Sequence, residues 1–406
     1  MKRTSRARRE WRPGDFQIHF IHTGVGESLF LIFPDATSML LDCGDQASIT
    51  RGAHAVPVLP GPERLAGEWV ARYVLRVNPR GADVDWLVVS HFHSDHTGTP
   101  HWQKYPSISP AYPGAPAEVP RLAADCARSG IGLAAEQLRF RRATDRGAPG
   151  YCDRIPPAPN APEGACIVEH VRAVHDALKR RDGLVVEPFR LGASDQFVAE
   201  HGGAPDFSVR NVCANGRLAM PDGSIRDLYA DALAGGALSL PLNENAMSLG
   251  MVFSYGAFRF ATCGDFSDRF TGPDGRQVFA EDALAEAIGP VSVAKLNHHG
   301  HHAIGRALAG TLRPRVWIAP VWDNLHCTDD TMEAIFDPAT PDDAQPLLIP
   351  TVLPVRHDGE RPWWRFTPQA CRTGCHVVVT VPEGGETFGV ELIDARREDG
   401  EVLDTF

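Results

Sequence analysis

The 406-residue sequence has no long hydrophobic run, no regular cysteine pattern and no excess of basic charge. No apolar stretch approaches the ~18 residues that cross a membrane. The nine cysteines are an odd number without regular spacing, which argues against a disulfide framework. With a formal net charge of −11, any surface for long nucleic acid would have to be local. We therefore expect a soluble cytoplasmic protein with no membrane segment and no long nucleic acid as partner.

Basic residues are concentrated at the start of the chain, in Met1–Arg12. This composition predicts a flexible basic arm over residues 1–14, and Arg8-Arg9 leaves open a missing or cleaved leader. Cys371-Arg372-Thr373-Gly374-Cys375-His376 could be half of a zinc site or a set of ordinary thiols, and no partner pair is nearby in sequence.

Segments with the pattern of strands alternate with segments with the pattern of helices. Strands are predicted at Gln17–Phe20, Leu29–Phe33, Met39–Leu41, Val84–Val89, Phe207–Cys213, Ser248–Phe253, Phe258–Thr262, Val291–Leu296 and Val316–Pro320. Helices are predicted at Arg64–Val77, Cys166–Arg181 and Glu281–Ile288. This alternation in both halves predicts an α/β sandwich of two mixed sheets packed face to face with helices outside.

Residues 15–340 are predicted to form one domain, followed by a β-rich C-terminal extension, 341–406, that packs on the core. Within the domain, Tyr105–Pro120 and Gly147–Pro162 are rich in proline, glycine and alanine. Such stretches form loops with few regular hydrogen bonds. We interpret residues 102–205 as an insertion over the edge that carries the motif described next.

The most informative stretch is His91-Phe92-His93-Ser94-Asp95-His96, which directly follows the apolar segment Val84–Val89. Side chains two apart on an extended segment point the same way, so His91 and His93 can share one metal ion. Asp95 and His96 follow where the strand ends and can face a second ion. Imidazole and carboxylate ligands suit zinc, manganese or iron, and a site with an open position activates water near neutral pH. The alternative is a solvated loop that happens to be rich in histidine.

Together with an acid after a strand in each half of the chain, this motif resembles the metallo-β-lactamase-fold superfamily. Within it, the chain is similar to the metallohydrolase domain at the C-terminus of bacterial DNA-uptake (competence) channel proteins. The further motifs are Gly24-Val25-Gly26-Glu27-Ser28, Leu40-Leu41-Asp42-Cys43-Gly44, Asn243-Glu244-Asn245-Ala246-Met247-Ser248-Leu249, Gly264-Asp265 and Lys295-Leu296-Asn297-His298-His299-Gly300. The resemblance covers residues 15–101 and 206–335 and implies a metal-dependent hydrolase.

The resemblance also implies ligands for one or two Zn²⁺ ions or, alternatively, Mn²⁺. His91 and His93 would bind the first ion. Asp95 and His96 would bind the second, and Asp265 would bridge both. His298 would close the second site with His299 in support, although these two could exchange roles. Asp42 would orient the histidine loop without binding metal.

One departure concerns the third histidine that the superfamily usually supplies to the first metal. At the matching place this chain has Cys213-Ala214-Asn215-Gly216 and no histidine. The competence branch also tends to lack this histidine. Asn215 could supply an oxygen, or the first site could be a weak two-histidine site. His170, His175 and His201 are the substitutes that residues 102–205 offer, with a structural role favoured for His175.

We expect a hydrolase with a mono- or dinuclear centre in which Asp95 orients the attacking water. His326 either assists the leaving group or is a loop histidine without a role. The expected substrate is a small molecule or a short phosphodiester or related ester. Two alternatives stay open: hydrolysis of a small carbonyl substrate (lactone, β-lactam or thioester), and non-catalytic binding on a degenerate hydrolase scaffold. The sequence leaves the oligomeric state open.

Overall fold

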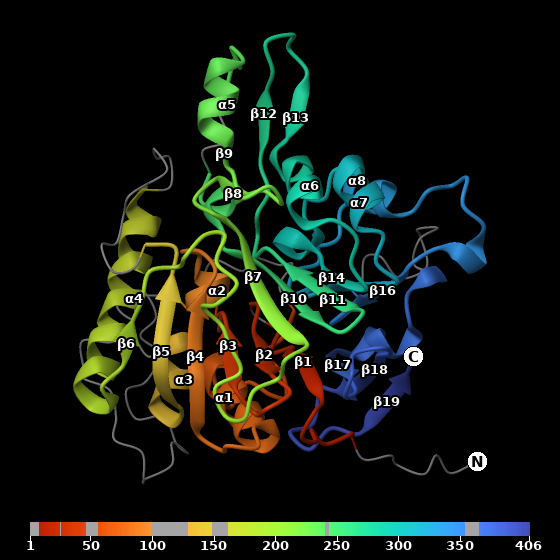
Figure 1. Ribbon diagram of the computed structural model, residues 1–406. Coiled ribbons are helices and arrows are strands. Elements are labelled where there is room, and N and C mark those ends of the chain that lie inside the picture. Colours follow the sequence, from red (N-terminus) through yellow and green to blue (C-terminus); the bar gives the residue numbers. More distant parts are fainter. Residues whose placement is uncertain are drawn as a thin grey trace.

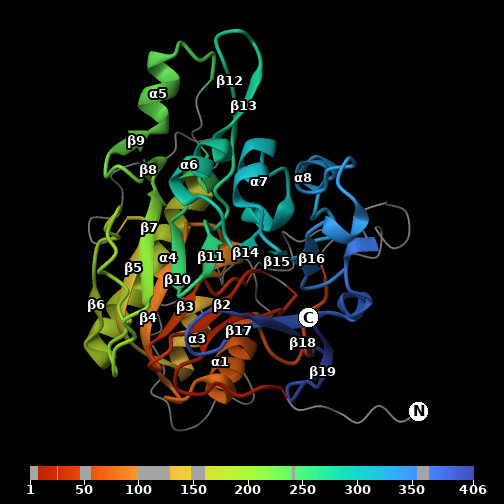
Figure 2. The same ribbon diagram turned by 45° about the vertical axis from the view of Figure 1, so that its right-hand side comes forward.

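The computed structural model describes residues 8–24, 26–45, 56–98, 129–147, 161–239, 243–353 and 365–406, with the backbone alone for 161–166. Two large mixed sheets lie against each other, and helices cover their outer faces (Figures 1 and 2). The expectation of an α/β sandwich of two mixed sheets with helices outside is confirmed.

The first sheet has nine strands in the order β19-β18-β17-β1-β2-β3-β4-β5-β6. Strands β3 to β6 are parallel to one another, and the other neighbours are antiparallel. The strands are β1 (Phe16–Phe20), β2 (Leu29–Ile32), β3 (Ser38–Leu41), β4 (Asp83–Val89), β5 (Arg139–Asp145), β6 (Val185–Val186), β17 (Cys375–Val381), β18 (Gly389–Asp394) and β19 (Val402–Thr405).

The second sheet has eight strands in the order β16-β15-β14-β11-β10-β7-β8-β9. Strands β11, β14, β15 and β16 are parallel, and the remainder are antiparallel. The strands are β7 (Phe207–Ala214), β8 (Arg217–Ala219), β9 (Ile225–Asp227), β10 (Gly250–Tyr255), β11 (Phe258–Thr262), β14 (Val293–Lys295), β15 (Val316–Ala319) and β16 (Leu347–Pro350). The predicted extension 341–406 thus supplies β16 to this sheet and β17–β19 to the other.

The main core lies between the two sheets and is rich in aromatic rings. Phe16 of β1 stacks on Phe253 of β10 at 5.9 Å between ring centroids, and Phe20 meets Phe260 of β11 edge to face at 5.9 Å. All four rings are fully buried. Such aromatic pairs add stability beyond the area that they bury. They therefore fix how one sheet lies on the other.

Two further apolar clusters attach the helices. On the first sheet the helices are α1 (Ala66–Val77), α3 (Ile131–Gln137) and α4 (Ala161–Asp182). On the second they are α6 (Leu284–Ile288), α7 (Arg306–Leu312) and α8 (Asp329–Ile335). None of the described helices is long and apolar enough to span a membrane.

The sequence pattern missed β5, which lies within the predicted insertion 102–205. Its arginines Arg139, Arg141 and Arg142 break the apolar pattern of a sheet strand. Arg139 pairs with Asp83 of β4 at 2.6 Å, and Arg141 pairs with Glu200 at 2.7 Å, so the charges lie at the surface while Phe140 and Ala143 are buried. The described part of residues 102–205 therefore extends the first sheet beyond β4.

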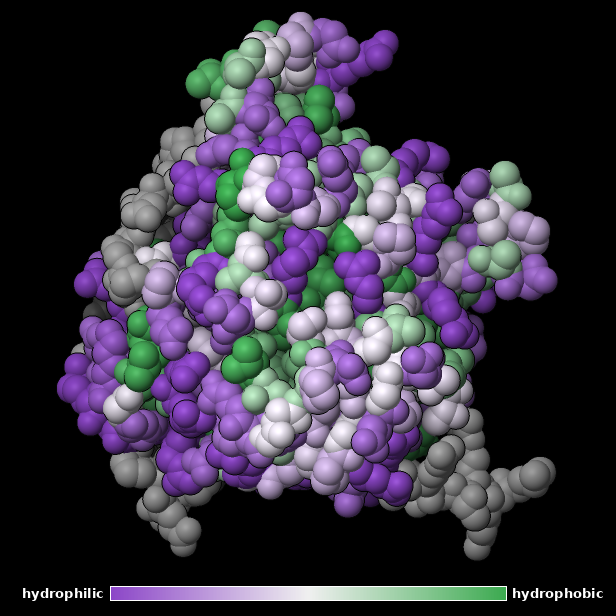
Figure 3. All heavy atoms as spheres, in the orientation of Figure 1, coloured by the Kyte–Doolittle hydropathy of each residue, from purple (hydrophilic) through white to green (hydrophobic). Residues whose placement is uncertain are grey.

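A narrow arm projects from the second sheet, formed by α5 (Leu228–Ala234) and the hairpin of β12 (Arg269–Thr271) and β13 (Gln277–Phe279) (Figure 1). Its apolar side chains include Leu233 and Leu238, each 69% exposed. Figure 3 shows hydrophobic residues at this tip, above a body surface where polar and apolar residues are mixed. The arm therefore contributes little to the core.

Glu281 lies in the short turn that follows β13, and its buried position should make the stability of the protein depend on pH. The residue is fully buried, and burial raises its pKa from 4.5 to about 8. Because the folded protein binds this proton more tightly than the unfolded chain, stability should fall as the pH rises from the lower to the higher value. Glu281→Gln should therefore be more stable than the wild type near pH 9, by about 5 kcal/mol, and equal to it near pH 4.

Urea unfolding across this pH range measures the effect. Glu286→Gln, at an exposed position of α6, is the matched control and should leave the curve unchanged. If the difference in the free energy of unfolding between the wild type and Glu281→Gln stayed the same at every pH, the expectation would be contradicted.

Candidate metal centre

The candidate centre lies where the carboxyl ends of parallel strands from both sheets meet. The histidine motif follows β4, Asp42 follows β3, Asp265 follows β11, and His298 and His299 follow β14. Ligands in open α/β sheets bind outside the carboxyl ends of the strands, because the connecting loops converge there. The strand order therefore brings together residues that are far apart in the sequence.

Asp42 holds His96 from behind. Its Oδ2 lies 2.8 Å from Nδ1 of His96 and accepts a hydrogen bond from Oγ of Ser90 at 2.6 Å, while Oδ1 accepts from the Ser90 backbone N–H at 2.7 Å. Burial raises the pKa of Asp42, and His96 opposes that shift. With Nδ1 engaged, His96 presents Nε2 to the centre. This is the orienting role that the resemblance implied for Asp42.

Glu27 lies behind His299 in a similar way. Nδ1 of His299 is 3.1 Å from the carbonyl oxygen of Pro320 and 3.3 Å from Oε2 of Glu27. A carbonyl oxygen can only accept, so Nδ1 carries the proton and Nε2 is the nitrogen available to a metal ion. Glu27 is therefore placed to orient His299 as Asp42 orients His96.

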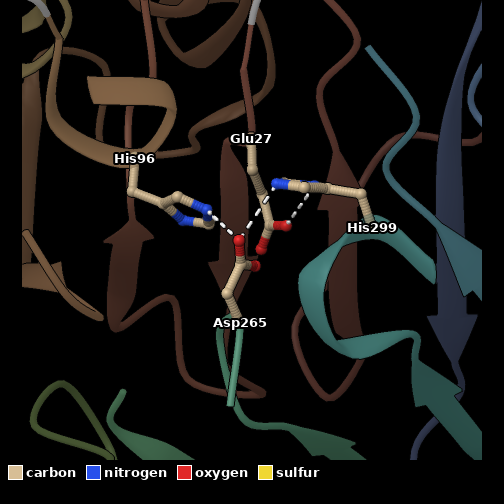
Figure 4. Close-up of side chains that lie close together, drawn as sticks. All are labelled: Glu27, His96, Asp265 and His299. Carbon is tan, nitrogen blue, oxygen red and sulfur yellow. Dashed lines mark ion pairs between the residues drawn. The ribbon is translucent and has the colours of Figure 1, made fainter. Parts of the chain in front are cut away.

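The two imidazoles meet at Asp265 (Figure 4). Oδ2 of Asp265 lies 3.1 Å from Nε2 of His96 and 3.2 Å from Nε2 of His299. Oδ2 of Asp95 is 3.0 Å from the same nitrogen of His299 and 3.7 Å from that of His96. Two donors that are each ~2.1 Å from one tetrahedral ion lie roughly 3.4 Å apart, so these separations suit a shared ion.

Charge is concentrated in this buried group. Burial alone would lower the pKa values of His96 and His299, but Asp265 and its neighbours hold both well above the ordinary value. Burial alone would raise the pKa values of Asp95 and Asp265, yet these two histidines hold both below the ordinary range. The group thus keeps its carboxylates ionised, and a metal ion would displace the Nε2 protons of the two histidines when it binds.

Unsatisfied polar atoms support a metal site at this place. Among the described residues, Nε2 of His96 and both carboxylate oxygens of Asp265 are buried without a hydrogen bond, although ion-pair partners are close. Buried polar atoms are ordinarily hydrogen-bonded, so exceptions need an explanation such as an ion. Glu27, His96, Asp265 and His299 also form the one group of potential ligands found among the described residues. The residues therefore fit a divalent cation.

His91 and His93 form a looser pair beside this group. Nε2 of His91 is 3.1 Å from Nδ1 of His93 and 4.0 Å from Oδ2 of Asp265. Burial lowers the pKa of His91, and His96 adds to that shift. Nδ1 of His91 meets Oγ of Ser90 at 3.1 Å. The two rings are close enough to share an ion, as the motif predicts, but they lack a third close ligand among the described residues.

The candidates for that third ligand are engaged elsewhere. Oδ1 of Asn215 accepts from Nη1 of Arg146 at 3.2 Å. Nε2 of His170 lies 3.2 Å from the Thr97 carbonyl, and Nε2 of His201 pairs with Asp85 at 2.9 Å. His175 is buried, and burial lowers its pKa to about 3. These hydrogen bonds of Asn215, His170 and His201 thus go to partners other than His91 and His93.

His298 and His299 are consecutive residues in the left-handed conformation, with φ of 49° and 55°. This conformation is unusual for histidine and clusters at functional sites. It turns the two rings apart: His299 faces the centre, whereas His298 lies between Asn245 (3.3 Å) and Ser267 (3.3 Å). Of the two rings, His299 is the one that meets Asp265.

His326 stacks on His299, with 4.9 Å between ring centroids and 17° between planes. Its Nδ1 lies 3.5 Å from the backbone N–H of Trp322, which can only donate. Nδ1 is therefore an acceptor, and Nε2 carries the proton. Burial lowers the pKa of His326, and His299 adds to that shift, so the ring is neutral.

Three features of the site were not assigned from the sequence. Glu27 and Lys295 stand in motifs but received no role, and the pair of Arg146 and Glu244 was not foreseen. Nζ of Lys295 is 2.9 Å from Oε2 of Glu27 and donates to the carbonyl of Gly264 at 2.8 Å. An acid directly after a glycine turn and a lysine just before a histidine pair were the available signals.

Asp42→Asn should weaken metal binding by about 10–100-fold, because an outer carboxylate orients its histidine and raises its basicity. Asn tolerates the φ of 60° at this position, so the backbone should be kept. A competition titration against a chromophoric chelator measures the change. Asp83→Asn, at the opposite end of β4, is the control, and a change below about threefold in Asp42→Asn would contradict the orienting role.

No protein-family model matches this chain, and no curated protein matches its sequence. Among solved structures it is similar to a mutant of CmlA beta-hydroxylase, with a TM-score of 0.32 and 13% identity, over 76% of this chain and 46% of that chain. It is similar to Zn²⁺-bound PqqB from Methylobacterium extorquens, with a TM-score of 0.30 and 10% identity, over 75% and 88%. It is also similar to the short form of human tRNase Z, with a TM-score of 0.27 and 11% identity, over 69% and 77%.

This chain therefore spans about half the length of the first of these structures. Because all three TM-scores lie below 0.5, these likenesses do not establish the family or the function of this chain. Its α/β sandwich and its candidate centre rest on its own strand order and side-chain geometry.

Proposed function

We propose that the protein is a metal-dependent hydrolase that acts on a phosphodiester or a related ester. One observation carries the proposal: the buried side chains of His96, His299, Asp95 and Asp265 converge at separations of 3.0–3.7 Å. Each of the two imidazoles is backed by a carboxylate, as is usual for metal-ligating histidines. Zinc is the first candidate for the metal and manganese the second, since imidazole and carboxylate donors suit both.

A divalent ion bound at this centre would act as a Lewis acid and lower the pKa of a bound water towards neutrality. Asp95 would accept a hydrogen bond from the attacking water and so orient it. Asp95 suits this role because its carboxylate is held ionised by His96 and His299. Asp265 and the two histidines would hold the centre in place around it.

His326 would act as a neutral hydrogen-bond donor to the attacked group or the leaving oxygen. Its Nε2 carries the proton because Nδ1 faces the Trp322 backbone N–H. The stacked contact with His299 places the ring directly beside the proposed centre. A donor fixed before the reaction stabilises developing negative charge without reorganisation.

The proposed substrate class rests on the hydrogen-bond donors around the centre and on the net charge of the protein. Half-buried imidazoles of His93, His298 and His301 lie around the centre and can donate hydrogen bonds to phosphate oxygens. The formal net charge of −11 disfavours long nucleic acid, because binding to a polyanion depends on cationic contacts along its length. We therefore propose a small or short phosphodiester as the substrate.

A substrate panel tests the proposal. Metal-stripped protein is refilled with Zn²⁺ or Mn²⁺ and assayed with bis(p-nitrophenyl) phosphate and with a lactone, a β-lactam and a thioester. We expect metal-dependent turnover of the phosphodiester and background rates with the others. Turnover of a carbonyl substrate alone would replace phosphodiester by carbonyl chemistry, and no turnover of any substrate by metal-loaded protein would support a binding role instead.

A further inference from the structure

The two sides of the proposed centre differ in what surrounds them. On the side of His96 and His299, Asp265 completes a buried set of three ligands, and Asp95 lies beside it. The side of His91 and His93 has two imidazoles and a 4.0 Å approach to Asp265. A metal site in a protein ordinarily needs at least three protein ligands. The second side therefore needs a further donor.

A carboxylate does reach this second side. Oε1 of Glu244 accepts a hydrogen bond from the backbone N–H of Phe92, the residue between His91 and His93, at 2.8 Å. Arg146 binds that carboxylate in a two-pronged ion pair, with Nε 2.6 Å from Oε1 and Nη2 2.6 Å from Oε2. Paired hydrogen bonds of this kind are the strongest that arginine makes with a carboxylate. Glu244 is therefore already committed to a cation.

Arg146 also binds the other candidate donor on this side. Its Nη1 donates to Oδ1 of Asn215 at 3.2 Å, and Nδ2 of Asn215 donates to the carbonyl of Arg146 at 2.8 Å. The guanidinium lies 4.6 Å from the ring centroid of Phe92, and the Arg146 side chain is 3% exposed. An arginine at such a place is a fixed, buried positive charge. It lies against the same turn that carries the two histidines.

We propose that the centre holds one resident divalent ion, bound by His96, His299 and Asp265 with Asp95 beside it to orient the attacking water, and that Arg146 is the fixed cation that takes the place of a second ion beside His91 and His93. The inference rests on the proposed metal centre and specifies how many metal ions that centre holds. The guanidinium keeps Glu244 and Asn215 from becoming ligands. It also supplies, next to the His91-Phe92-His93 turn, the positive charge that a second ion would bring.

Metal analysis of the full chain tests this stoichiometry. Metal-free protein is titrated with Co²⁺ and followed by visible absorption, and bound metal is counted by mass spectrometry after gel filtration. We expect saturation at one equivalent per chain. Two equivalents bound with similar affinity would overturn the proposal.

Matched variants assign the ion to one side. His299→Gln should weaken Co²⁺ binding at least about 100-fold, and His93→Gln should change it less than about threefold. Loss of the ion in His93→Gln with retention in His299→Gln would overturn the assignment. Circular dichroism checks that both variants are folded.

Arg146→Gln tests the part assigned to the arginine. Removing its charge frees the Glu244 carboxylate, so metal content should rise above one equivalent, whereas Arg146→Lys keeps a charge and should stay at one. A folded Arg146→Gln that still binds one ion would overturn the role of Arg146. If this variant does not fold, the metal count of the wild type and the comparison of His299→Gln with His93→Gln still decide the proposal. One bound ion without turnover would contradict only the proposed function, and two bound ions would contradict only this inference.

Discussion

Asp265→Asn should weaken metal binding at least about 100-fold and reduce hydrolysis at least about 1000-fold, which corresponds to about 4 kcal/mol of lost stabilisation. The reason is position: Oδ2 of Asp265 is the atom at which Nε2 of His96 and of His299 meet. Asparagine keeps the size of the side chain but removes the negative charge that a divalent ion requires. Metal affinity and turnover of bis(p-nitrophenyl) phosphate measure the two effects separately.

Asp274→Asn is the matched control for this variant. Asp274 lies between β12 and β13 with a largely exposed side chain, so the same substitution there should change neither property. Circular dichroism distinguishes loss of the site from loss of the fold. If folded Asp265→Asn kept its metal affinity within about threefold, the centre would lie elsewhere.

Lys295→Met should destabilise the metal-free protein by about 3 kcal/mol, because removing one partner of a buried ion pair leaves the other charge uncompensated. Lys295 and Glu27 are both buried, with 2.9 Å between Nζ and Oε2. Glu27 and Asp265 hold the pKa of Lys295 above its ordinary value although burial opposes this. Lys295 also donates to the carbonyls of Gly264 and Leu296, and its pair with Glu27 joins segments from both halves of the chain.

A double-mutant cycle with Glu27→Gln tests whether the two charges act as a pair. The variant that carries both changes should be less destabilised than the sum of the single changes, with a coupling energy above about 1 kcal/mol. Urea unfolding in the presence of a chelator gives the four stabilities. Additive effects, within about 0.5 kcal/mol, would show that the two side chains stabilise the fold independently.

The sequence carried most of the fold because its strands are continuous apolar segments. The run of β4 predicted a buried strand that delivers the histidine motif to its end, and the structure places it so. The acids after two strands, Asp42 and Asp265, were noticed as a repeated pattern. In the fold they lie on opposite sides of the same imidazole: Asp42 at Nδ1 of His96 and Asp265 at its Nε2.

The parts that the sequence did not yield depend on pairing between distant segments. β5 was missed because its arginines find carboxylates only once β4 and Glu200 lie beside it. Glu27 is assigned through its contacts with Lys295 and His299, and Glu244 through its contact with Arg146. Local patterns of apolar residues contain no information on these pairings. The choice between His298 and His299 likewise depends on backbone angles that spacing alone does not specify.

The most direct test of the central claim is a titration of metal-free protein with Mn²⁺ during hydrolysis of bis(p-nitrophenyl) phosphate, in the wild type and in Asp95→Asn. We expect no turnover without metal, and a turnover rate that rises with added Mn²⁺ until the centre is filled. Folded Asp95→Asn should show no such rise even when it has bound metal. Turnover that needs no metal, or that persists in Asp95→Asn, would contradict the assignment of this centre as the site of a metal-dependent hydrolase.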